Sequence, residues 1–302
     1  MPLLPVPATA ILPPSSALPP APVAQLHDEA FDPSRLGAYH LDILLTEGHC
    51  RLTVREAARQ KVVVLEDWTL AAASALPALA AGHELLGRAG WAGVRLAVGG
   101  GAFTLLPAPL FRPGDEAAYL GLHYTLGATE QALAYALPPG SPAHELVSIF
   151  GTEAAVAEWL QATHGPTARL LHHTSALVAG LLHQRGPAAP TRQLYLHLAG
   201  PELTLVVLGT QLEFCNVFAI STPEDAVYYT ILVMQELGLN PDQDTVTIWG
   251  DLTSESAIFT LLRTYVRHLR FGSRPFGLQY SYRLNELAEC RHFELFSLAF
   301  CD

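Results

Sequence analysis

The chain is short of basic residues, and lysine is almost absent. Its 302 residues include 17 Lys and Arg against 28 Asp and Glu, which gives a formal net charge of −11. Lys61 is the only lysine. Because nucleic-acid backbones are held by Lys and Arg, this balance argues against a nucleic-acid partner. A single lysine also leaves almost no candidate for a Schiff base or a P-loop.

Paired cysteines and long apolar runs are also missing. The four cysteines lie far apart and form no C-x-x-C pair, so we expect free thiols in a reducing cytoplasm. No uninterrupted apolar run reaches the length of about 20 residues that spans a bilayer. The first thirty residues are rich in Pro and Ala and contain no Lys or Arg, which does not suit a secretory signal. We therefore predict a flexible tail over residues 1–34 and a cytoplasmic protein.

Common catalytic and metal-binding motifs are absent as well. The chain contains no Walker A run, no G-x-G-x-x-G, no G-x-S-x-G and no EF-hand loop. The three glycines at 99–101 precede an apolar segment that reads as a strand, so they predict a turn and not a phosphate loop at a helix start. Four nearby histidines lack the spacing of zinc ligands, and we expect no metal site among them: His164, His172, His173 and His183.

What is present is a repeated pattern of strands and helices. Three strands joined by short turns are predicted twice, at 39–45, 49–55 and 61–66, and at 194–198, 203–208 and 211–218. A helix and a further strand follow each set, at 69–88 and 93–98, and from Thr222 to Gly238 and 245–249. Strands joined by two-residue turns are antiparallel, whereas a strand after a helical crossover is normally parallel. Each half is therefore predicted to be a mixed sheet with packed helices, an α/β arrangement.

The remaining segments complete a two-lobed organisation. Short strands at 102–106, 130–137, 145–150 and 167–171, with helices from Thr152 and over 174–184, interrupt the repeat. We place a first lobe at 35–186, with an inserted subdomain at about 102–186. A second lobe follows at 187–302, beyond the Gly/Pro-rich linker, with a helix at 253–270 and a C-terminal segment packing back on the body.

Three segments carry a resemblance to a known family. They are L-E-F-C-N-V-F at 212–218, D-A-V-Y-Y at 225–229 and F-E-L-F-S-L-A-F-C at 293–301. With the repeated layout, they resemble an uncharacterised bacterial family, a domain of unknown function that is distantly similar to the cell-division protein FtsA and the pilus-assembly protein PilM. The resemblance covers roughly residues 36–302. It implies an actin-like ATPase (ribonuclease H-like) fold whose two lobes face each other.

The resemblance also implies three phosphate-binding and nucleotide-binding motifs, and this chain departs from each of them. The first-lobe D-x-G turn retains Asp42, but Leu44 stands where glycine would let the backbone approach a phosphate. In the second phosphate loop His197 replaces the acid, and only Gly200 is retained. The adenosine motif normally has paired glycines, and here only Gly250 remains.

These departures lead to a hypothesis with two alternatives. Phosphoryl transfer depends on positioning and charge stabilisation, and each lost group costs about 10²- to 10³-fold in rate. We therefore predict a degenerate ATPase homologue with no cofactor and no catalytic residues, which acts as a scaffold for a protein partner. One alternative is an ATPase or switch that binds ATP and Mg²⁺ through Asp42, Thr46, Gly200 and Gly250. The other is a membrane-associated assembly protein similar to FtsA and PilM, although the apolar residues 286–300 lack a basic face.

Overall fold

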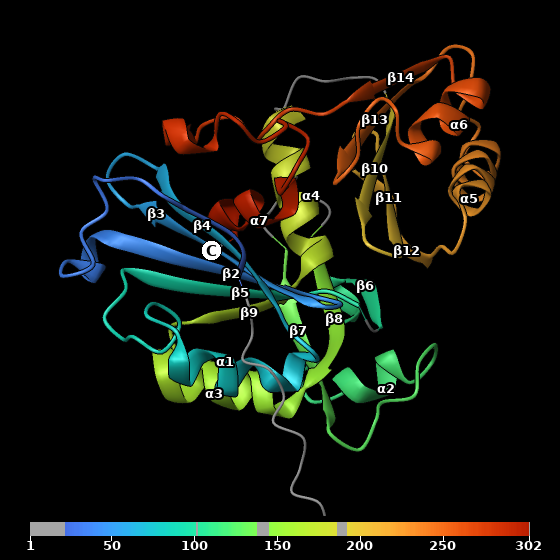
Figure 1. The fold of residues 1–302 in the computed structure, drawn as a ribbon. Helices are drawn as coiled ribbons and strands as arrows, with labels where there is room; N and C mark the ends of the chain where they lie inside the picture. Colours follow the sequence, from blue (N-terminus) through green and yellow to red (C-terminus); the bar gives the residue numbers. More distant parts are fainter. Residues whose placement is uncertain (1–21, 101, 138–144, 186–191, 302) are drawn as a thin grey trace, which may run out of the picture.

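Two mixed sheets of the same design, together with a smaller third sheet, organise the chain (Figure 1). The computed structural model describes residues 22–100, 102–137, 145–185 and 192–301. The repeated strands predicted from the sequence are present in both halves, and the α/β class with mixed sheets is confirmed.

The first sheet has the strand order β1-β4-β3-β2-β5-β9. Its meander is antiparallel, whereas β5 and β9 extend it as parallel strands. A short strand, β15, also pairs with β4 in parallel. The strands of this sheet are β1 (Pro22–His27), β2 (Tyr39–Thr46), β3 (His49–Glu56), β4 (Lys61–Thr69), β5 (Gly93–Val98), β9 (Arg169–His172) and β15 (Gln279–Tyr280).

The second sheet repeats this design in the order β12-β11-β10-β13-β14. An antiparallel meander of three strands is again followed by two parallel strands. Its strands are β10 (Gln193–Ala199), β11 (Glu202–Leu208), β12 (Leu212–Ala219), β13 (Thr245–Gly250) and β14 (His268–Phe271).

The third sheet is antiparallel and has the order β6-β8-β7. It consists of β6 (Phe103–Pro107), β7 (Glu130–Ala136) and β8 (Leu146–Glu153), with the short helix α2 (Glu116–Leu120) packed against it. These strands fall in the region where the repeat was expected to break. The chain then returns to the first sheet through β9.

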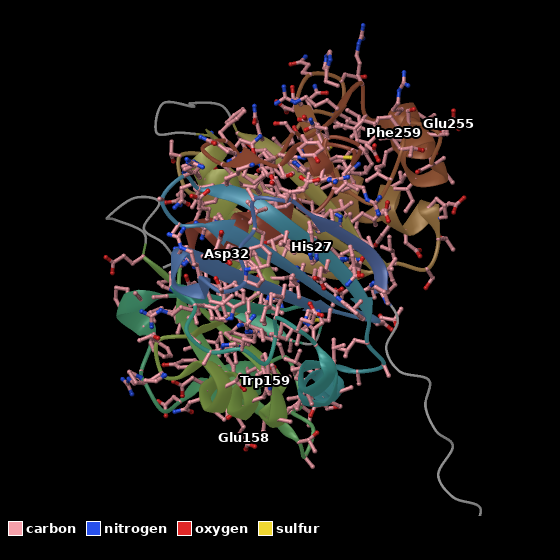
Figure 2. All side chains as sticks on the ribbon, turned by 60° about the vertical axis from the view of Figure 1, so that its left-hand side comes forward. His27, Asp32, Glu158, Trp159, Glu255 and Phe259 are labelled. Atoms are coloured by element: carbon pink, nitrogen blue, oxygen red, sulfur yellow. The ribbon has the colours of Figure 1, made fainter. Side chains whose placement is uncertain are left out.

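Helices cover the two large sheets (Figure 1). Glu158 and Glu255 are exposed, whereas Phe259 is buried in the second core (Figure 2). No helix in the described ranges is long and apolar enough to cross a membrane. The helices are α1 (Leu76–Gly82), α3 (Ala154–His164), α4 (His173–Arg185), α5 (Pro223–Glu236), α6 (Ala257–Tyr265) and α7 (Phe293–Ser297), with short 3-10 turns η1 (Leu36–Ala38), η2 (Ala73–Ala75), η3 (Ala108–Leu110), η4 (Tyr282–Leu284) and η5 (Leu298–Phe300).

Helix α4 joins the two large sheets, because its two faces belong to different apolar cores. Ala176 and Ala179 pack in the core of the first sheet. Leu177 and Leu181 pack with Trp249 of the second sheet in a separate cluster. Figure 1 shows α4 standing between the sheets. Both lobes are therefore anchored to one helix.

Three predictions need correction. Residues 22–27, assigned to the flexible tail over 1–34, form β1 and pair with β4, because this stretch lies beyond the densest run of prolines and can fill the sheet edge. Residues 1–21 lie outside the described residues. The helix expected over 69–88 is only α1 after a 3-10 turn, since Pro77 stands in its first turn and starts it. The helix expected over 253–270 ends at Tyr265, and the alternating residues 268–271 form β14.

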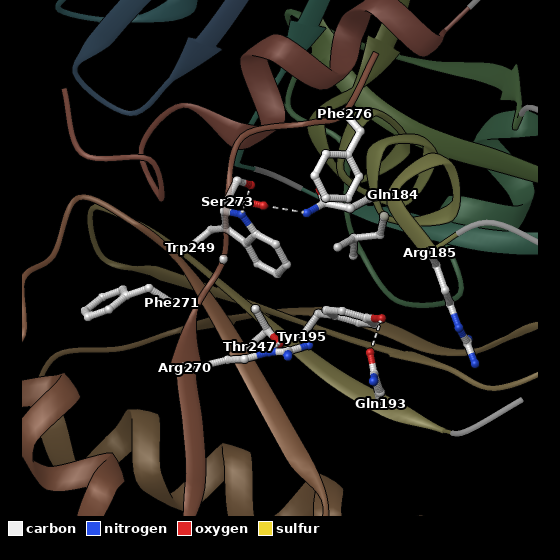
Figure 3. A pocket seen from close by; sticks show the side chains of 12 residues that line it. Gln184, Arg185, Gln193, Tyr195, Thr247, Trp249, Arg270, Phe271, Ser273 and Phe276 are labelled. Atoms are coloured by element: carbon white, nitrogen blue, oxygen red, sulfur yellow. Dashed lines mark hydrogen bonds between the residues drawn. The ribbon is translucent and has the colours of Figure 1, made fainter. Parts of the chain in front are cut away.

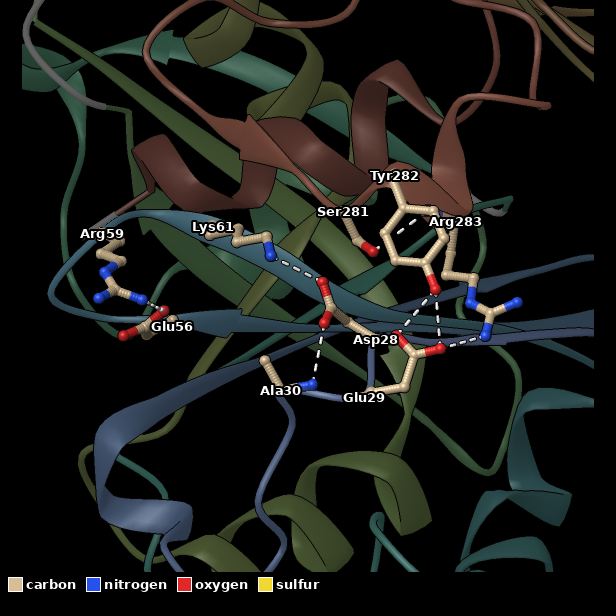
Figure 4. A network of polar contacts seen from close by, with 9 residues as sticks. All are labelled: Asp28, Glu29, Ala30, Glu56, Arg59, Lys61, Ser281, Tyr282 and Arg283. Atoms are coloured by element: carbon tan, nitrogen blue, oxygen red, sulfur yellow. Dashed lines mark hydrogen bonds and ion pairs between the residues drawn. The ribbon is translucent and has the colours of Figure 1, made fainter.

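A polar network ties the start of the described chain to a segment near its end (Figure 4). Asp28 accepts hydrogen bonds from Lys61 Nζ at 2.7 Å and from the Ala30 amide at 2.9 Å. Glu29 accepts one from the Tyr282 hydroxyl at 2.7 Å and also pairs with Arg283. The hydrogen bond from Lys61 is the main reason that the pKa of the Asp28 carboxyl falls to about 2.

We expect Lys61→Met to lower the free energy of unfolding at pH 7 by about 2 kcal/mol, because Asp28 is 7% exposed and would lose its charged partner. The folded pKa of Asp28 lies below its usual 3.8, so the pair stabilises above that pH and its contribution is lost as the pH falls toward 2. Urea unfolding at pH 7 and pH 3 measures both effects. The matched control is Arg59→Met, whose side chain is 71% exposed beside Glu56. Equal stability of the two variants at pH 7 would contradict the assignment.

Candidate functional site at the junction of the two sheets

The C-terminal segment, residues 290–301, lies at the junction of the two large sheets. Helix α7 and the turn η5 pack between the first sheet and α4, as Figure 1 shows. Phe293, Leu295, Leu298 and Cys301 are each 0% exposed. This segment is therefore built into the interior of the protein.

The segment is also bonded to the second sheet. The Gly250 amide donates to the Cys290 carbonyl at 2.9 Å. Arg291 pairs with Asp251 at 2.8 Å. Residues 290–291 thus hold the end of β13, while the residues after them pack on the first sheet and α4. The segment bridges the two lobes.

Helices α4 and α7 approach each other closely, and a glycine makes this contact feasible. A Cβ atom added at Gly180 would lie 2.0 Å from Ser297 Oγ and 2.6 Å from Ser297 Cβ. The Ser297 hydroxyl donates to the Phe293 carbonyl at 2.6 Å, so its direction is set. Any larger side chain at Gly180 would push α7 away from α4.

A buried carboxylate stands at the centre of this junction. Glu294 of α7 is 3% exposed, and its Oε2 lies 3.2 Å from Nδ1 of His173 in α4 and 3.3 Å from Nδ1 of His197 in β10. Burial opposes ionisation, but the two imidazoles outweigh it and hold the pKa of Glu294 at about 2. A buried charge persists only where it is paired, and here the two partners come from two other elements, α4 and β10.

The pKa values of three surrounding histidines are lowered, which disfavours their protonation. Burial lowers the pKa of His197 and moves that of His172 well below its ordinary value. Burial, followed by the charges of Arg51 and Arg291, lowers the pKa of His292 to about 3. The junction thus contains one firmly ionised carboxylate, and its imidazoles resist additional positive charge.

A second carboxylate, that of Glu202 in β11, lies against Gly100, which follows β5. Glu202 follows the Gly200 turn, and its carboxylate accepts a hydrogen bond from the Gly100 amide. Burial raises the pKa of Glu202; the charge of His173 opposes this, whereas those of Glu294 and Glu47 raise it further. Glu47 and Glu294 therefore each lie within electrostatic reach of Glu202.

Asp42, the acid that the chain retains from the D-x-G turn, is buried in ion pairs. It is 1% exposed, and its carboxylate oxygens lie 3.5 Å from Arg55 Nε and 3.3 Å from Arg95 Nη1. Arg95 also donates to the Cys301 carbonyl. Asp42 is therefore part of the contact between the first sheet and the C-terminal segment.

The other three predicted residues lie at strand ends. Thr46 closes β2 and lies against Gly99. Gly200 has a φ of 56° in an open turn, and Gly250 has a φ of 135° at a site where a Cβ would lie 2.3 Å from the Leu198 carbonyl oxygen. Because Leu198 aligns with Gly250 in the parallel pair, the structure brings Gly200 and Gly250 to one edge of the second sheet. Asp42, by contrast, lies in β2 of the first sheet.

Sequence reasoning missed Glu202 and Glu294. The available signal for Glu294 was a single acid inside the apolar run at 294–300, since a charge in such a run needs a buried partner. The histidine cluster in the sequence is dispersed: His164 packs against Trp159, and His183 stacks on Phe300. Among the described residues, no three His, Cys, Asp or Glu side chains are arranged to hold a metal ion.

We expect Gly180→Ala to reduce the free energy of unfolding by about 2 kcal/mol, although alanine favours a helix interior over glycine by about 1 kcal/mol. The cause is the clash with Ser297, so adding Ser297→Gly should recover part of the loss. Chemical unfolding of the single and double variants measures this coupling. Gly82→Ala is the matched control, because a Cβ there meets nothing within 4 Å. A stabilising effect of Gly180→Ala would mean that the two helices are not in close contact.

Comparison with known proteins supports the fold. A family model described as "Protein of unknown function (DUF3822)" matches residues 28–269. A Bacteroides thetaiotaomicron protein with an actin-like ATPase fold and unknown function is similar in structure, with a TM-score of 0.73, 16% identity, and coverage of 90% of this chain and 99% of that chain. The PilM–PilN type IV pilus biogenesis complex gives a TM-score of 0.53 and 13% identity, covering 89% of this chain and 99% of that chain. No curated protein matches the sequence.

The family match covers most of the chain, and the structural matches extend over nearly all of it. They agree with the resemblance carried by the segments at 212–218, 225–229 and 293–301. The chain therefore has the actin-like ATPase fold and belongs to the family described as "Protein of unknown function (DUF3822)".

Proposed function

We propose that this protein is a non-catalytic actin-like scaffold whose own C-terminal segment takes the place of a nucleotide, and that it works by binding a protein partner. The observation that carries the proposal is the burial of Glu294 between His173 and His197. This carboxylate is an internal anion at the junction of the two lobes, where the resemblance implies a triphosphate. It is covalently part of the chain, so it cannot be exchanged or hydrolysed.

Two of the four residues predicted to hold ATP and Mg²⁺, Asp42 and Gly250, already have partners within the chain, as does the amide of the nearby Gly100. Asp42 is paired with Arg55 and Arg95, and the Gly100 amide is bonded to the Glu202 carboxylate. The Gly250 amide is bonded to the Cys290 carbonyl. Phosphate binding at glycine turns depends on backbone amides that are open to the anion. These residues therefore do not fit the ATP and Mg²⁺ that the fold family implies.

The local charge also disfavours a triphosphate. Glu47 and Glu294 each lie within electrostatic reach of Glu202, and a phosphate placed beside Glu202 would meet like charges. At 4 Å each such pair costs about 4 kcal/mol near a protein surface before salt screening. The nearby imidazoles do not offset this cost, because burial lowers the pKa of His172 and His197.

The surface between α5 and α6 is the most suitable place for a partner. An apolar groove of about 460 Å³ lies there, with Tyr228 62% exposed and Tyr265 54% exposed at its rim. Exposed tyrosines are enriched at protein interfaces. Asp225 has a separate role, because it caps α5 by accepting from the Ser221 and Thr222 amides. Glu224 also lines the groove. The groove therefore suits an amphipathic partner helix that carries a basic residue beside its apolar face.

A binding test with nucleotide addresses the first half of the proposal. We expect no Mg²⁺-dependent heat when the full chain is titrated with ATP to about 1 mM, and no phosphate release above background. The reason is that Asp42 and the amides of Gly100 and Gly250 are already occupied. Isothermal titration and a phosphate assay provide the measurements. Micromolar Mg²⁺-dependent binding with turnover that Asp42→Ala abolishes would refute the proposal and favour an ATPase or switch.

A partner test addresses the second half. We expect the amount of the partner protein that co-purifies with the tagged chain to fall at least about 10-fold in the Tyr228→Ala/Tyr265→Ala variant. The reason is that anchoring tyrosines typically contribute more than about 1 kcal/mol each to binding. Quantitative mass spectrometry of purifications from the native cell provides the measurement. Glu158→Ala, an exposed change on α3, is the control that should retain the partner. Identical partner profiles for all three proteins would exclude the groove as the docking surface.

A further inference from the structure

We propose that the cavity between the C-terminal end of α4 and the second sheet is a binding site for a small organic anion with a flat aromatic body. The cavity has a volume of about 420 Å³ and is lined by residues of α4, β10 and β13 and of the segment 270–276 (Figure 3). Ligand pockets typically measure about 300–1,000 Å³. None of His173, His197 or Glu294 lines it, so this site is separate from the junction.

The charge of the lining selects an anion. Arg185 and Arg270 line the cavity, and no Asp or Glu among the described residues does, in a chain whose formal net charge is −11. Arg185 is also bonded to the Gly209 carbonyl. Both guanidinium groups act on Tyr195 in the wall: burial raises the pKa of its phenol, and the two positive charges oppose that rise. Two cations thus line one cavity of an acidic protein, a pattern that suits a carboxylate or a phosphate.

The polar groups are oriented, and they leave bonding capacity for a ligand. Arg270 Nε donates to Thr247 Oγ1 at 3.1 Å, which directs the guanidinium and leaves its Nη groups as donors. Gln184 Nε2 donates to Ser273 Oγ at 3.0 Å, while its Oε1 is buried without a hydrogen-bond partner among the described residues.

The apolar part of the lining selects a flat ring. Tyr195 and Trp249 line the cavity, and Phe276 is 60% exposed beside them. The Trp249 indole is fixed, because its N–H donates to the Ser273 carbonyl at 2.9 Å and a Cβ at Gly272 would lie 1.8 Å from its ring. A large exposed phenylalanine at the mouth of a cavity gains favourable contact when a second ring packs against it. The ligand class is therefore an anion that carries an aromatic ring.

Titration of the full chain with 1-naphthyl phosphate tests this assignment. We expect binding with a Kd below about 1 mM and at least about 10-fold weaker binding of 1-naphthylmethylamine, which has the same ring and the opposite charge. Inorganic phosphate alone should bind at least about 10-fold more weakly than the naphthyl compound, because it lacks the ring. Binding should not require Mg²⁺, which distinguishes it from nucleotide binding at the junction.

Variants locate the site. Arg270→Gln should weaken binding of the naphthyl phosphate at least about 10-fold, because a charged hydrogen bond is lost. Phe276→Ala should weaken its binding about 5-fold, because the ring contact is lost. Arg263→Gln, which removes an exposed arginine of α6, is the matched control and should change the Kd less than about 2-fold. Thermal unfolding confirms that each variant is folded. No binding at 1 mM, equal binding of the amine, or equal Kd values for Arg270→Gln and Arg263→Gln would each overturn the proposal.

Discussion

The contact of buried Glu294 with His173 and His197 is the polar interaction on which the junction of this protein depends. It joins the C-terminal segment, helix α4 and strand β10, which also share an apolar cluster around Phe293. A carboxylate that is 3% exposed has lost most of its hydration, so it is stable there only while both imidazoles remain close. Any opening of the two lobes at this point would leave a buried charge unpaired. The pair therefore favours one relative arrangement of the lobes.

The same C-terminal segment also contacts residues around two of the predicted nucleotide-binding positions, Asp42 and Gly250. Arg95 contacts both Asp42 and the Cys301 carbonyl, and the Cys290 carbonyl accepts the Gly250 amide. Glu202 supplies an internal anion to the Gly100 amide in the same way. Asp42 and the amides of Gly100 and Gly250 are thus paired within the chain. This internal pairing is the physical basis of the scaffold proposal, which places binding of other molecules at the outer groove on α5 and α6 and at the arginine-lined cavity.

Elements defined by local pattern were predictable from the sequence. Helix α5 is an example, because Thr222 and Asp225 form a capping box whose bonds are within four residues of one another. The two meanders were also predictable, since their turns and alternating residues lie close together in the chain. Residues 268–271 show the limit of this reasoning. Their apolar residues continued a helical spacing, but pairing of β14 with β13 offered backbone hydrogen bonds that only the folded sheet provides.

The sequence by itself determined the α/β class, the repeated mixed sheets and the departures from the nucleotide motifs at Leu44, His197 and Gly250, because all of these are readable from residue type and short spacing. Only the tertiary structure decided that Asp42 pairs with Arg55 and Arg95 and that Glu294 lies between two histidines. His173 and Glu294 are 121 residues apart. No local periodicity encodes such a contact, because it forms only when the packing of α7 against α4 excludes water and makes each buried charge require a partner.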